Sequence, residues 1–307
     1  MVRFLLARFV QMVLSLIFMS LVVFALSRAA GDPVAVLLPE TATIEERQAF
    51  RAEQGLDKPI PTQYLLWASK AVRGDLGRSV LAGIPVTEML RERIAGSAEL
   101  AFSGLLVSLL VGVVGGVYSA ARHKSRFDYL ARVFASMGQS MPSFWLGIML
   151  ILVFGVWLHI LPAGGADEPT SIILPALTLG LVTGAGVLRL TRSSMLEVLD
   201  KEYIKVARIK GLSETEILWK HALKNAAPVV LTYAGLILFA LLTGTIVVEQ
   251  VFGWPGIGSL LFNSVFSRDF PVVQGGVLLV TLVYLIGNFL VDIGYAVLNP
   301  RIQLAKS

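Results

Sequence analysis

Six long apolar runs without charged residues alternate with polar segments along the chain. Each run has at least 17 residues, which is enough for a helix to cross the hydrocarbon core of a bilayer with some tilt. The runs cover residues 9–26, 100–121, 133–158, 171–188, 226–248 and 272–291. The pattern therefore predicts an all-α integral membrane protein with six transmembrane helices.

The first run shares features with a signal peptide, because Arg3 and Arg8 precede it and "SRAAG" follows it. Its apolar core of 18 residues is, however, longer than the usual hydrophobic region of a signal peptide. We therefore expect residues 1–28 to be retained as an N-terminal transmembrane helix.

The polar segment 29–97, between the first and second runs, carries the signals of an ordered subdomain. The sequence "GDP" at 31–33 predicts a turn, and Thr43 followed by Glu46 predicts a capping box at the start of a short helix. Residues 63–72 place apolar side chains at helical spacing. A segment of about 65 residues is too small for a core of its own, so it should pack on the membrane helices or on a partner.

A second organised polar segment, "EYIKVARIKGLSETEILWKHALKN" at 202–225, follows the fourth run. Asp200 is a candidate cap for a first helix, and Gly211 after a basic residue is typical of a helix end. Ser213 and Glu216 then predict a capping box for a second helix, which runs into the fifth apolar run. The segment is therefore expected to form a helical hairpin.

The first helix of this hairpin has an apolar stripe at roughly helical spacing. Its members are Tyr203, Ile204, Ala207 and Ile209. A helix this short is marginal alone, so the stripe must be buried by something. Either the chain's own membrane domain or a docked soluble protein could bury it.

Composition supports the membrane assignment, and charge gives its orientation. Hydrophobic residues make up 55% of the chain and charged residues 15%, whereas soluble domains carry roughly 25% charged residues. With the N-terminus in the cytoplasm, the cytoplasmic segments hold sixteen Lys or Arg, and the short outer loops 159–170 and 249–271 hold only Arg268. The positive-inside rule thus places both termini and the hairpin in the cytoplasm. The net charge of +5 reflects this topology and does not indicate nucleic-acid binding.

The residues do not form a pattern typical of catalysis or metal binding. The chain contains no Gly-Lys pair, so it lacks the loop that cradles nucleotide phosphates, and its three His are scattered. The absence of Cys excludes disulfides and cysteine-based metal or redox chemistry. We therefore expect a non-catalytic protein without its own metal or cofactor, which supplies a path across the membrane and takes energy from a partner.

A secondary carrier or channel and a scaffold without transport are the alternatives. A carrier or channel needs a proton relay, gating charges or a selectivity filter within its spans. Asp292 is the only carboxylate well inside an apolar stretch, and it has no obvious basic partner in another span. A scaffold does not account for the many Gly, or for Pro142 and Pro175 in or at the start of spans, where Pro allows kinks.

Eight further short motifs stand in order along the chain. They are "GDP" at 31–33, "EQGLDKPIPTQYLLW" at 53–67, "GDLGRS" at 74–79, "SMPSFWLGIML" at 140–150, "LPAGG" at 161–165, "VFGWPGIG" at 251–258, "RDFPVVQGGVLL" at 268–279 and "NFLVDIGYAVLNPRI" at 288–302. With the hairpin, they make nearly the whole chain similar to ABC importer permeases, in particular the first permease of dipeptide, oligopeptide and nickel importers. The resemblance implies a type I ABC importer permease fold, with a five-helix core at 98–307 and a coupling loop at about 193–225.

In that family the short helix of the coupling loop fits a groove on an ATPase subunit and transmits its movements to the spans. The resemblance assigns this coupling to Tyr203, Lys205, Val206, Ala207, Arg208, Gly211 and Leu212. Gly211 and Ala207 match the loop's Gly and second Ala. Lys205 stands where the loop has the Glu that names it, and Val206 stands at its first Ala. The contact is therefore expected to depend on shape around Ala207 and Gly211 rather than on that acid.

The resemblance also implies two further sites. The candidate pathway or gate consists of Met141, Pro142, Ser143, Phe144 and Trp145. The residues expected to contact a binding protein or to shape the outer gate are Asp32, Asp75, Arg78, Trp254, Arg268 and Asp269.

The implied partners are a second homologous permease that forms a heterodimer, two cytoplasmic subunits that bind ATP and Mg, an extracytoplasmic solute-binding protein and the lipid bilayer. The implied location is the cytoplasmic (inner) membrane of a bacterium or archaeon. The chain would form half of a translocation pathway that works by alternating access. Its solute could be a dipeptide, oligopeptide, glutathione, opine or nickel chelate, because the binding protein does most of the choosing.

Overall fold

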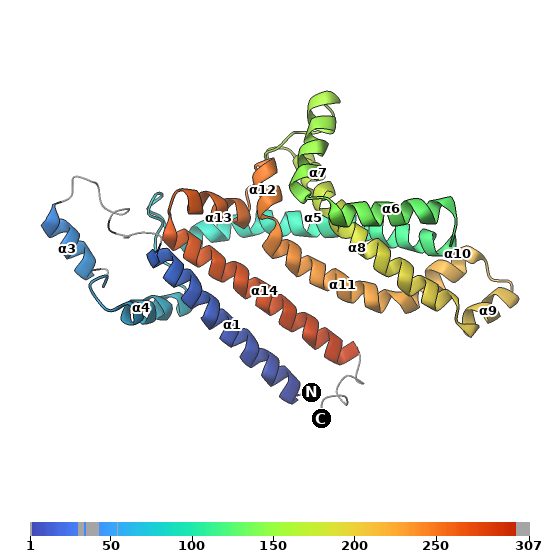
Figure 1. Ribbon diagram of the computed structural model, residues 1–307, viewed down its shortest axis with the longest axis horizontal. Helices are drawn as coiled ribbons and strands as arrows, with labels where there is room; N and C mark the ends of the chain where they lie inside the picture. The colour runs from blue at the N-terminus through green and yellow to red at the C-terminus, as the bar shows by residue number, and fades with distance from the viewer. Residues whose placement is uncertain (1, 30–33, 35–42, 54, 299–307) are drawn as a thin grey trace.

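The computed structural model describes residues 2–29, 34, 43–53 and 55–298, which form a bundle of long helices (Figure 1). Within these ranges five helices are long and apolar enough to cross a membrane, and there are six candidate spans if one bent helix pair is counted as a single span. The five are α1 (Val2–Ala29), α5 (Val86–Ala121), α8 (Ile173–Leu199), α11 (Leu223–Gly244) and α14 (Phe270–Leu298). The all-α membrane fold predicted from the apolar runs is confirmed.

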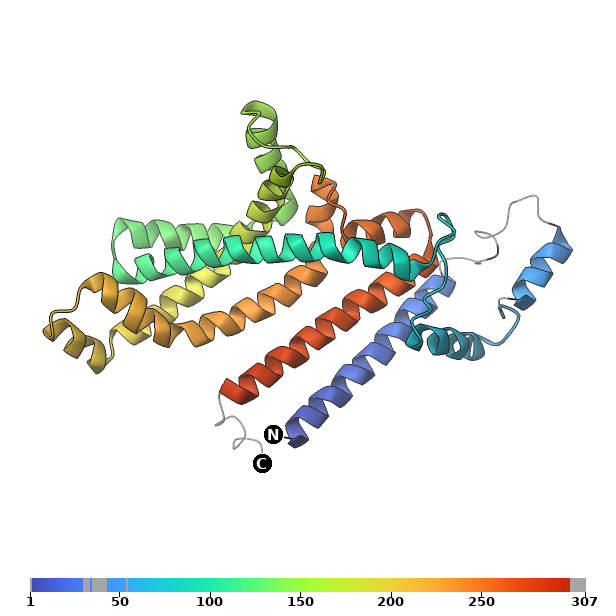
Figure 2. The same ribbon diagram turned by 180° about the vertical axis from the view of Figure 1, so that it is seen from behind.

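The centre of the bundle is the contact between α5 and α8, which run side by side in the same direction (Figures 1 and 2). A Cβ added at Gly112 would overlap the Cβ of Val187 and would lie 2.9 Å from the carbonyl oxygen of Gly184. Small residues at such a contact let two backbones approach closely in lipid, where association depends on packing. The main apolar core lies beside this contact and includes Leu100 and Leu174.

Replacing Gly112 with Ala is expected to destabilise the protein by about 1–3 kcal/mol, because the added methyl group overpacks the contact between α5 and α8. Gly294→Ala in α14 is the matched control, since a Cβ there meets nothing within 4 Å. The control should be neutral or slightly stabilising, because Ala favours helix over Gly. Thermal unfolding of both purified variants in detergent measures the difference, and equal melting temperatures would contradict the packing argument.

The third apolar run, 133–158, does not form one straight span. Instead, α6 (Arg126–Ser140) is followed by α7 (Ser143–Leu150) and the π-helix η1 (Ile151–Trp157) at an angle of 109°. Met141 has an extended backbone, with φ −83° and ψ 128°, as expected for the residue before a Pro. The sequence indicated a kink at Pro142, but the direction of α7, out of the bundle and against α12 (Ile246–Phe252), is set by packing (Figure 1).

The outer end of the bundle contains more helix than the sequence predicted. The loop expected at 249–271 holds most of α12 and all of α13 (Ile257–Phe266). In the other outer segment, α3 (Ile44–Glu53) begins with the predicted capping box. The N–H of Glu46 donates to Thr43 Oγ1 at 3.2 Å, and the N–H of Thr43 donates to Glu46 Oε2 at 2.8 Å.

Helix α4 (Ile60–Val72) packs on α1, where the hydroxyl groups of Tyr64 and Ser20 form a hydrogen bond of 2.8 Å. This contact places part of the outer segment 29–97 on the chain's own first span. The end of that segment belongs to α5, which begins at Val86.

Helices α1 and α14 lie side by side and run in opposite directions (Figures 1 and 2). Arg8 Nε therefore meets Asp292 Oδ2 at 3.2 Å. The expectation that Asp292 has no basic partner in another span is wrong. The partner was not apparent in the sequence because it lies near the opposite end of the chain and at the polar edge of the first run.

Candidate functional site

The helical hairpin predicted at the cytoplasmic end is present as α9 (Glu202–Ile209), α10 (Glu214–Glu216) and the π-helix η3 (Ile217–Ala222). Helix α9 ends in a Schellman motif. The N–H of Gly211 donates to the carbonyl of Arg208 at 3.0 Å, and that of Leu212 donates to the carbonyl of Ala207 at 3.3 Å. Gly211 has φ +79°, a conformation that is costly for other residues. Gly211 therefore ends the helix, as the sequence predicted.

The caps of the hairpin are partly as predicted. Ser213 Oγ accepts a hydrogen bond of 3.2 Å from the N–H of Glu216, as expected for the start of the second helix. Asp200 does not cap α9, because α8 continues to Leu199 and leaves Asp200 with a helical backbone. Lys201 takes the N-cap position instead, with an extended backbone and no side-chain cap. The second helix continues through η3 into α11.

The apolar positions of α9 lie on two faces rather than on one stripe. Ile204 is fully buried in a cluster that includes Val117 of α5 and Met195 of α8, and Ala207 packs against this cluster. On the other face Tyr203, Val206 and Ile209 are 46%, 47% and 86% exposed. The chain's own membrane domain therefore buries one side of α9, and an apolar side remains open to a docked protein.

Ion pairs lie on the polar side of the hairpin. Arg208 Nε lies 2.8 Å from Glu214 Oε1, which connects α9 to α10 across the Gly turn. Lys205 Nζ lies 2.8 Å from Glu202 Oε1, and this hydrogen bond raises the pKa of Lys205 above its ordinary value. Such exposed pairs contribute little stability. The shape of the hairpin therefore depends mainly on the buried side of α9 and on the turn at Gly211.

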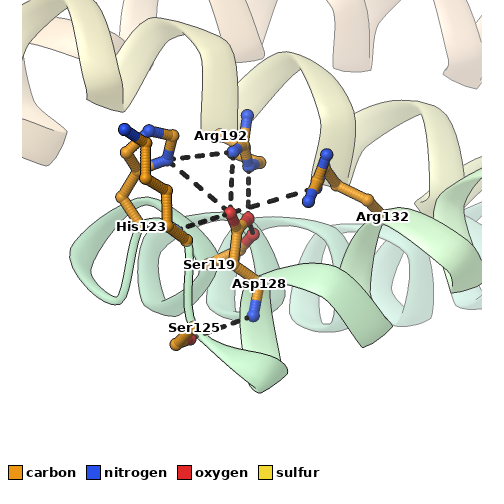
Figure 3. A network of polar contacts seen from close by, with 7 residues as sticks. Ser119, His123, Ser125, Asp128, Arg132 and Arg192 are labelled. Carbon is orange, nitrogen blue, oxygen red and sulfur yellow. Dashed lines mark hydrogen bonds and ion pairs between the residues drawn. The ribbon is translucent and has the colours of Figure 1, made fainter.

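A buried carboxylate lies close to the ends of α5 and α8 against which the hairpin packs. Asp128, in the first turn of α6, is 1% exposed and lies at the centre of a polar network (Figure 3). It accepts two hydrogen bonds from Arg192 of α8, at 2.6 Å from Nε and 2.9 Å from Nη2. It also accepts one from Ser119 Oγ at 2.7 Å and one from the N–H of Lys124 at 3.0 Å. The network joins the end of α5, the following turn, α6 and α8.

The electrostatics of this network favour an ionised Asp128. The residue lies in the polar segment 122–132, outside the apolar run of the third span. Hydrogen bonds from Arg192 hold the pKa of the Asp128 carboxyl far below its ordinary range and outweigh the opposite effect of burial. His123 Nδ1 and Arg132 Nε lie farther away, at 3.6 and 3.9 Å from Asp128 Oδ2.

Sequence reasoning did not identify Asp128 or Arg192 as site residues. Both look like ordinary solvated charges of cytoplasmic segments, and they are 64 positions apart. The available signal was local: Ser125 caps α6 by accepting a hydrogen bond from the N–H of Asp128. That pattern indicates a helix start but not a partner on another helix.

A second buried carboxylate, Glu249 of α12, organises the outer end of the bundle. It is 0% exposed, and its Oε1 accepts hydrogen bonds from Ser97 Oγ at 2.7 Å and Thr245 Oγ1 at 2.6 Å. Its Oε2 accepts from the N–H of Ser259 at 2.9 Å. A Cβ at Gly256 would overlap this carboxyl group, so only Gly fits there. Glu249 thus connects α5, α12 and α13.

Two residues expected at the outer contact are buried in this chain. Trp254 is 4% exposed, and its Nε1–H donates to the carbonyl of Gly96 at 2.8 Å. Asp269 is 3% exposed and accepts a hydrogen bond of 2.5 Å from Ser79 Oγ. Both side chains hold outer segments together, which is compatible with shaping a gate but leaves little surface for docking.

The remaining residues of that set differ in exposure or lie outside the described chain. Asp75, Arg78 and Arg268 are exposed, whereas Asp32 lies outside the described residues. The structure therefore brings Asp75, Arg78 and Arg268 to the surface on the outer side, where a contact with a binding protein stays a prediction.

The candidate pathway residues lie together at the break between α6 and α7. Phe144 and Trp145 are 48% and 46% exposed, and Pro142 is exposed as well. Met141 and Ser143 are half-buried. A facing subunit or a solute could therefore reach this region, and its role as a pathway stays a prediction.

Two family descriptions match the chain. A binding-protein-dependent transport system inner membrane component matches residues 112–304, and the N-terminal part of a binding-protein-dependent transport system membrane component matches residues 1–83.

Curated relatives span the same length. The chain is 38% identical to the dipeptide transport system permease protein DppB of Escherichia coli (strain K12) in an alignment of 339 positions that covers all of both chains. It is 37% identical over 292 residues to the oligopeptide transport system permease protein AppB of Bacillus subtilis (strain 168), covering 91% of this chain and 92% of the relative. It is 38% identical over 304 residues to the glutathione transport system permease protein GsiC of Escherichia coli (strain K12), covering 99% of this chain and 99% of the relative.

Solved structures share the fold at lower identity. A chain of the MetNI methionine ABC transporter, in an inward-facing conformation, matches with a TM-score of 0.51 and 18% identity, over 67% of this chain and 96% of that chain. A chain of an amino acid ABC transporter with histidines matches with a TM-score of 0.52 and 15% identity, over 67% and 92% respectively.

Proposed function

This chain belongs to the family of binding-protein-dependent transport system inner membrane components, and we propose that it forms half of the pathway by which an ABC importer moves peptides or a related small solute. As a permease subunit it is itself non-catalytic, since ATP hydrolysis belongs to other subunits of such a transporter. The names of the relatives support the solute class, because they are permeases for dipeptides, oligopeptides and glutathione.

The observation that carries the coupling part of the proposal is the open face of α9. Ile204 and Ala207 seat the helix on the bundle, while Ile209 remains 86% exposed at the cytoplasmic end. An exposed apolar patch rimmed by polar residues is typical of a protein–protein interaction site. We infer that a cytoplasmic ATPase subunit docks on Tyr203, Val206 and Ile209.

The proposed assembly follows from this docking and from the family. A second permease faces this chain and completes the pathway, and two ATPase subunits bind ATP and Mg below the two permeases. A solute-binding protein delivers the cargo to the outer side, and the assembly lies in the inner membrane of a bacterium. Closure of the ATPase subunits would displace the coupling hairpins, and the spans would follow in an alternating-access cycle.

Reconstitution tests this function. The chain in proteoliposomes, together with its second permease, ATPase subunits and binding protein, is expected to take up labelled peptide only when ATP is present on the ATPase side. The chain alone should take up none. ATP-independent uptake by the chain alone would instead support a secondary carrier or channel.

A further inference from the structure

We propose that Asp128 and Arg192 are positioning residues for transport, because their contact makes α6 move with the coupling hairpin. A displacement of α9 would then reach the helix break at Met141–Pro142. The inference rests on the proposed docking of an ATPase subunit on α9. It adds a defined route from that docking face to the candidate pathway.

The first step of the route is the buried contact between the hairpin and the ends of α5 and α8. Ile204 of α9 and Ile217 of η3 are fully buried against Val117 of α5 and Met195 of α8. Closely packed interiors transmit a displacement as rigid-body movement, because they deform little. A push or pull on α9 therefore acts directly on the cytoplasmic ends of α5 and α8.

The second step joins α6 to the same support. Arg192 precedes Met195 by about one turn of α8, and its guanidinium holds Asp128 with two hydrogen bonds (Figure 3). Asp128 is 1% exposed, so loss of the Arg192 contact would leave a buried charge poorly compensated. Because separating the two residues is unfavourable, the contact keeps the start of α6 packed against α8.

The contact between α6 and α8 continues to the other end of α6. Ala131 and Ala135 of α6 form a buried cluster with Leu188 of α8. A Cβ added at Gly138 would lie 2.7 Å from the Cβ of Ala185, so the two backbones are very close there. The ionic contact and this close packing together hold α6 along α8 over nearly its full length.

The third step is the break itself. Helix α6 ends at Ser140, and α7 leaves at 109° after the extended residues Met141 and Pro142. Helix α7 packs on α12 as well as α8, so its supports differ from those of α6. A displacement of α6 relative to α12 would therefore change the geometry at the break, where Phe144 and Trp145 are exposed.

The experiment uses the full transporter and exploits the absence of Cys from the chain. Asp128→Asn is expected to lower ATP-driven peptide uptake roughly tenfold, within the range of coupling effects for such networks, while the ATPase subunits still co-purify. Arg132→Gln is the matched control. Arg132 is exposed and lies 3.9 Å from Asp128, so its loss should leave uptake near the wild-type rate.

A Cys pair, Gly138→Cys with Ala185→Cys, allows a disulfide to link α6 and α8 in place of the contact between Asp128 and Arg192. The Cβ atoms need only separate slightly to reach the 3.5–4.5 Å typical of a disulfide. Oxidation should leave uptake unchanged in the chain with the pair alone, and should restore uptake when Asp128→Asn is also present. Each oxidised sample is compared with the same protein after reduction, so that any effect of the Cys substitutions themselves on uptake is the same in both samples.

The inference would be overturned by normal uptake in Asp128→Asn, by no restoration on oxidation, or by a block of uptake by the disulfide without Asp128→Asn. The last would mean that α6 and α8 must separate during the cycle. Loss of ATPase co-purification in Asp128→Asn would also count against the inference, because it would place the defect at docking. Failure of the proposed function would show differently, as no ATP-driven uptake by the unmodified assembly.

Discussion

Replacing Ile209 with Glu is expected to abolish co-purification of the ATPase subunits and to reduce peptide uptake at least roughly tenfold. Burying an Ile side chain at an interface contributes about 1.5–3 kcal/mol, and a carboxylate in an apolar groove adds a desolvation cost. Ile209 is 86% exposed in this chain, so the substitution leaves the seat of α9 intact. The amount of variant in the membrane fraction should therefore stay normal.

Two further substitutions give the Ile209 experiment its controls. Val72→Glu makes a comparable change at a residue that is 90% exposed on α4, at the outer side, and should leave ATPase co-purification unchanged. Ile204→Glu places the charge on the buried face of α9 instead and should reduce the amount of folded protein. Normal co-purification and uptake in the Ile209→Glu variant would sink the docking hypothesis.

Replacing Glu249 with Ala is the second change with a large expected effect, a loss of about 2–4 kcal/mol of stability. Ser97, Thr245 and the N–H of Ser259 would lose their buried acceptor, and each unsatisfied group costs about 1 kcal/mol or more. The lost side-chain volume adds a cavity beside Gly256. Thermal unfolding in detergent should show a clearly lower melting temperature.

Glu249→Gln separates hydrogen bonding from charge at the same position. The Gln carbonyl can accept from the N–H of Ser259, and its amide N–H groups can face the hydroxyls of Ser97 and Thr245, which can rotate to accept. The Gln variant should therefore lose only about 1 kcal/mol. Equal destabilisation by Gln and Ala would mean that the site depends on the negative charge rather than on its hydrogen bonds.

Some features of this protein follow from residues near one another in the chain. Long apolar runs predict spans because a bilayer requires about 20 apolar residues in a row, and five of the six runs each largely coincide with one candidate span. The capping box at Thr43 and the helix end at Gly211 were also predictable, because each depends on contacts within a few residues. The family resemblance was carried by ordered motifs, and the comparisons confirm it.

Other features depended on which residues meet across the bundle. Arg192 lies 64 positions from Asp128, and Ser97 lies 152 positions from Glu249, so no local pattern marks either contact. Burial of Trp254 and the ion pair between Arg8 and Asp292 were hidden for the same reason.

The sequence by itself determined most of the spans, the helical hairpin and the family, and it predicts their orientation in the membrane. Only the tertiary structure decided which side of α9 is buried, how sharply the third span bends, and which polar side chains hold the two ends of the bundle. For the spans, the physical reason is that a membrane helix is apolar on every side, so its pattern does not reveal which face packs. The decisive contacts are close approaches at small residues and a few buried hydrogen bonds, and these exist only once the helices are assembled.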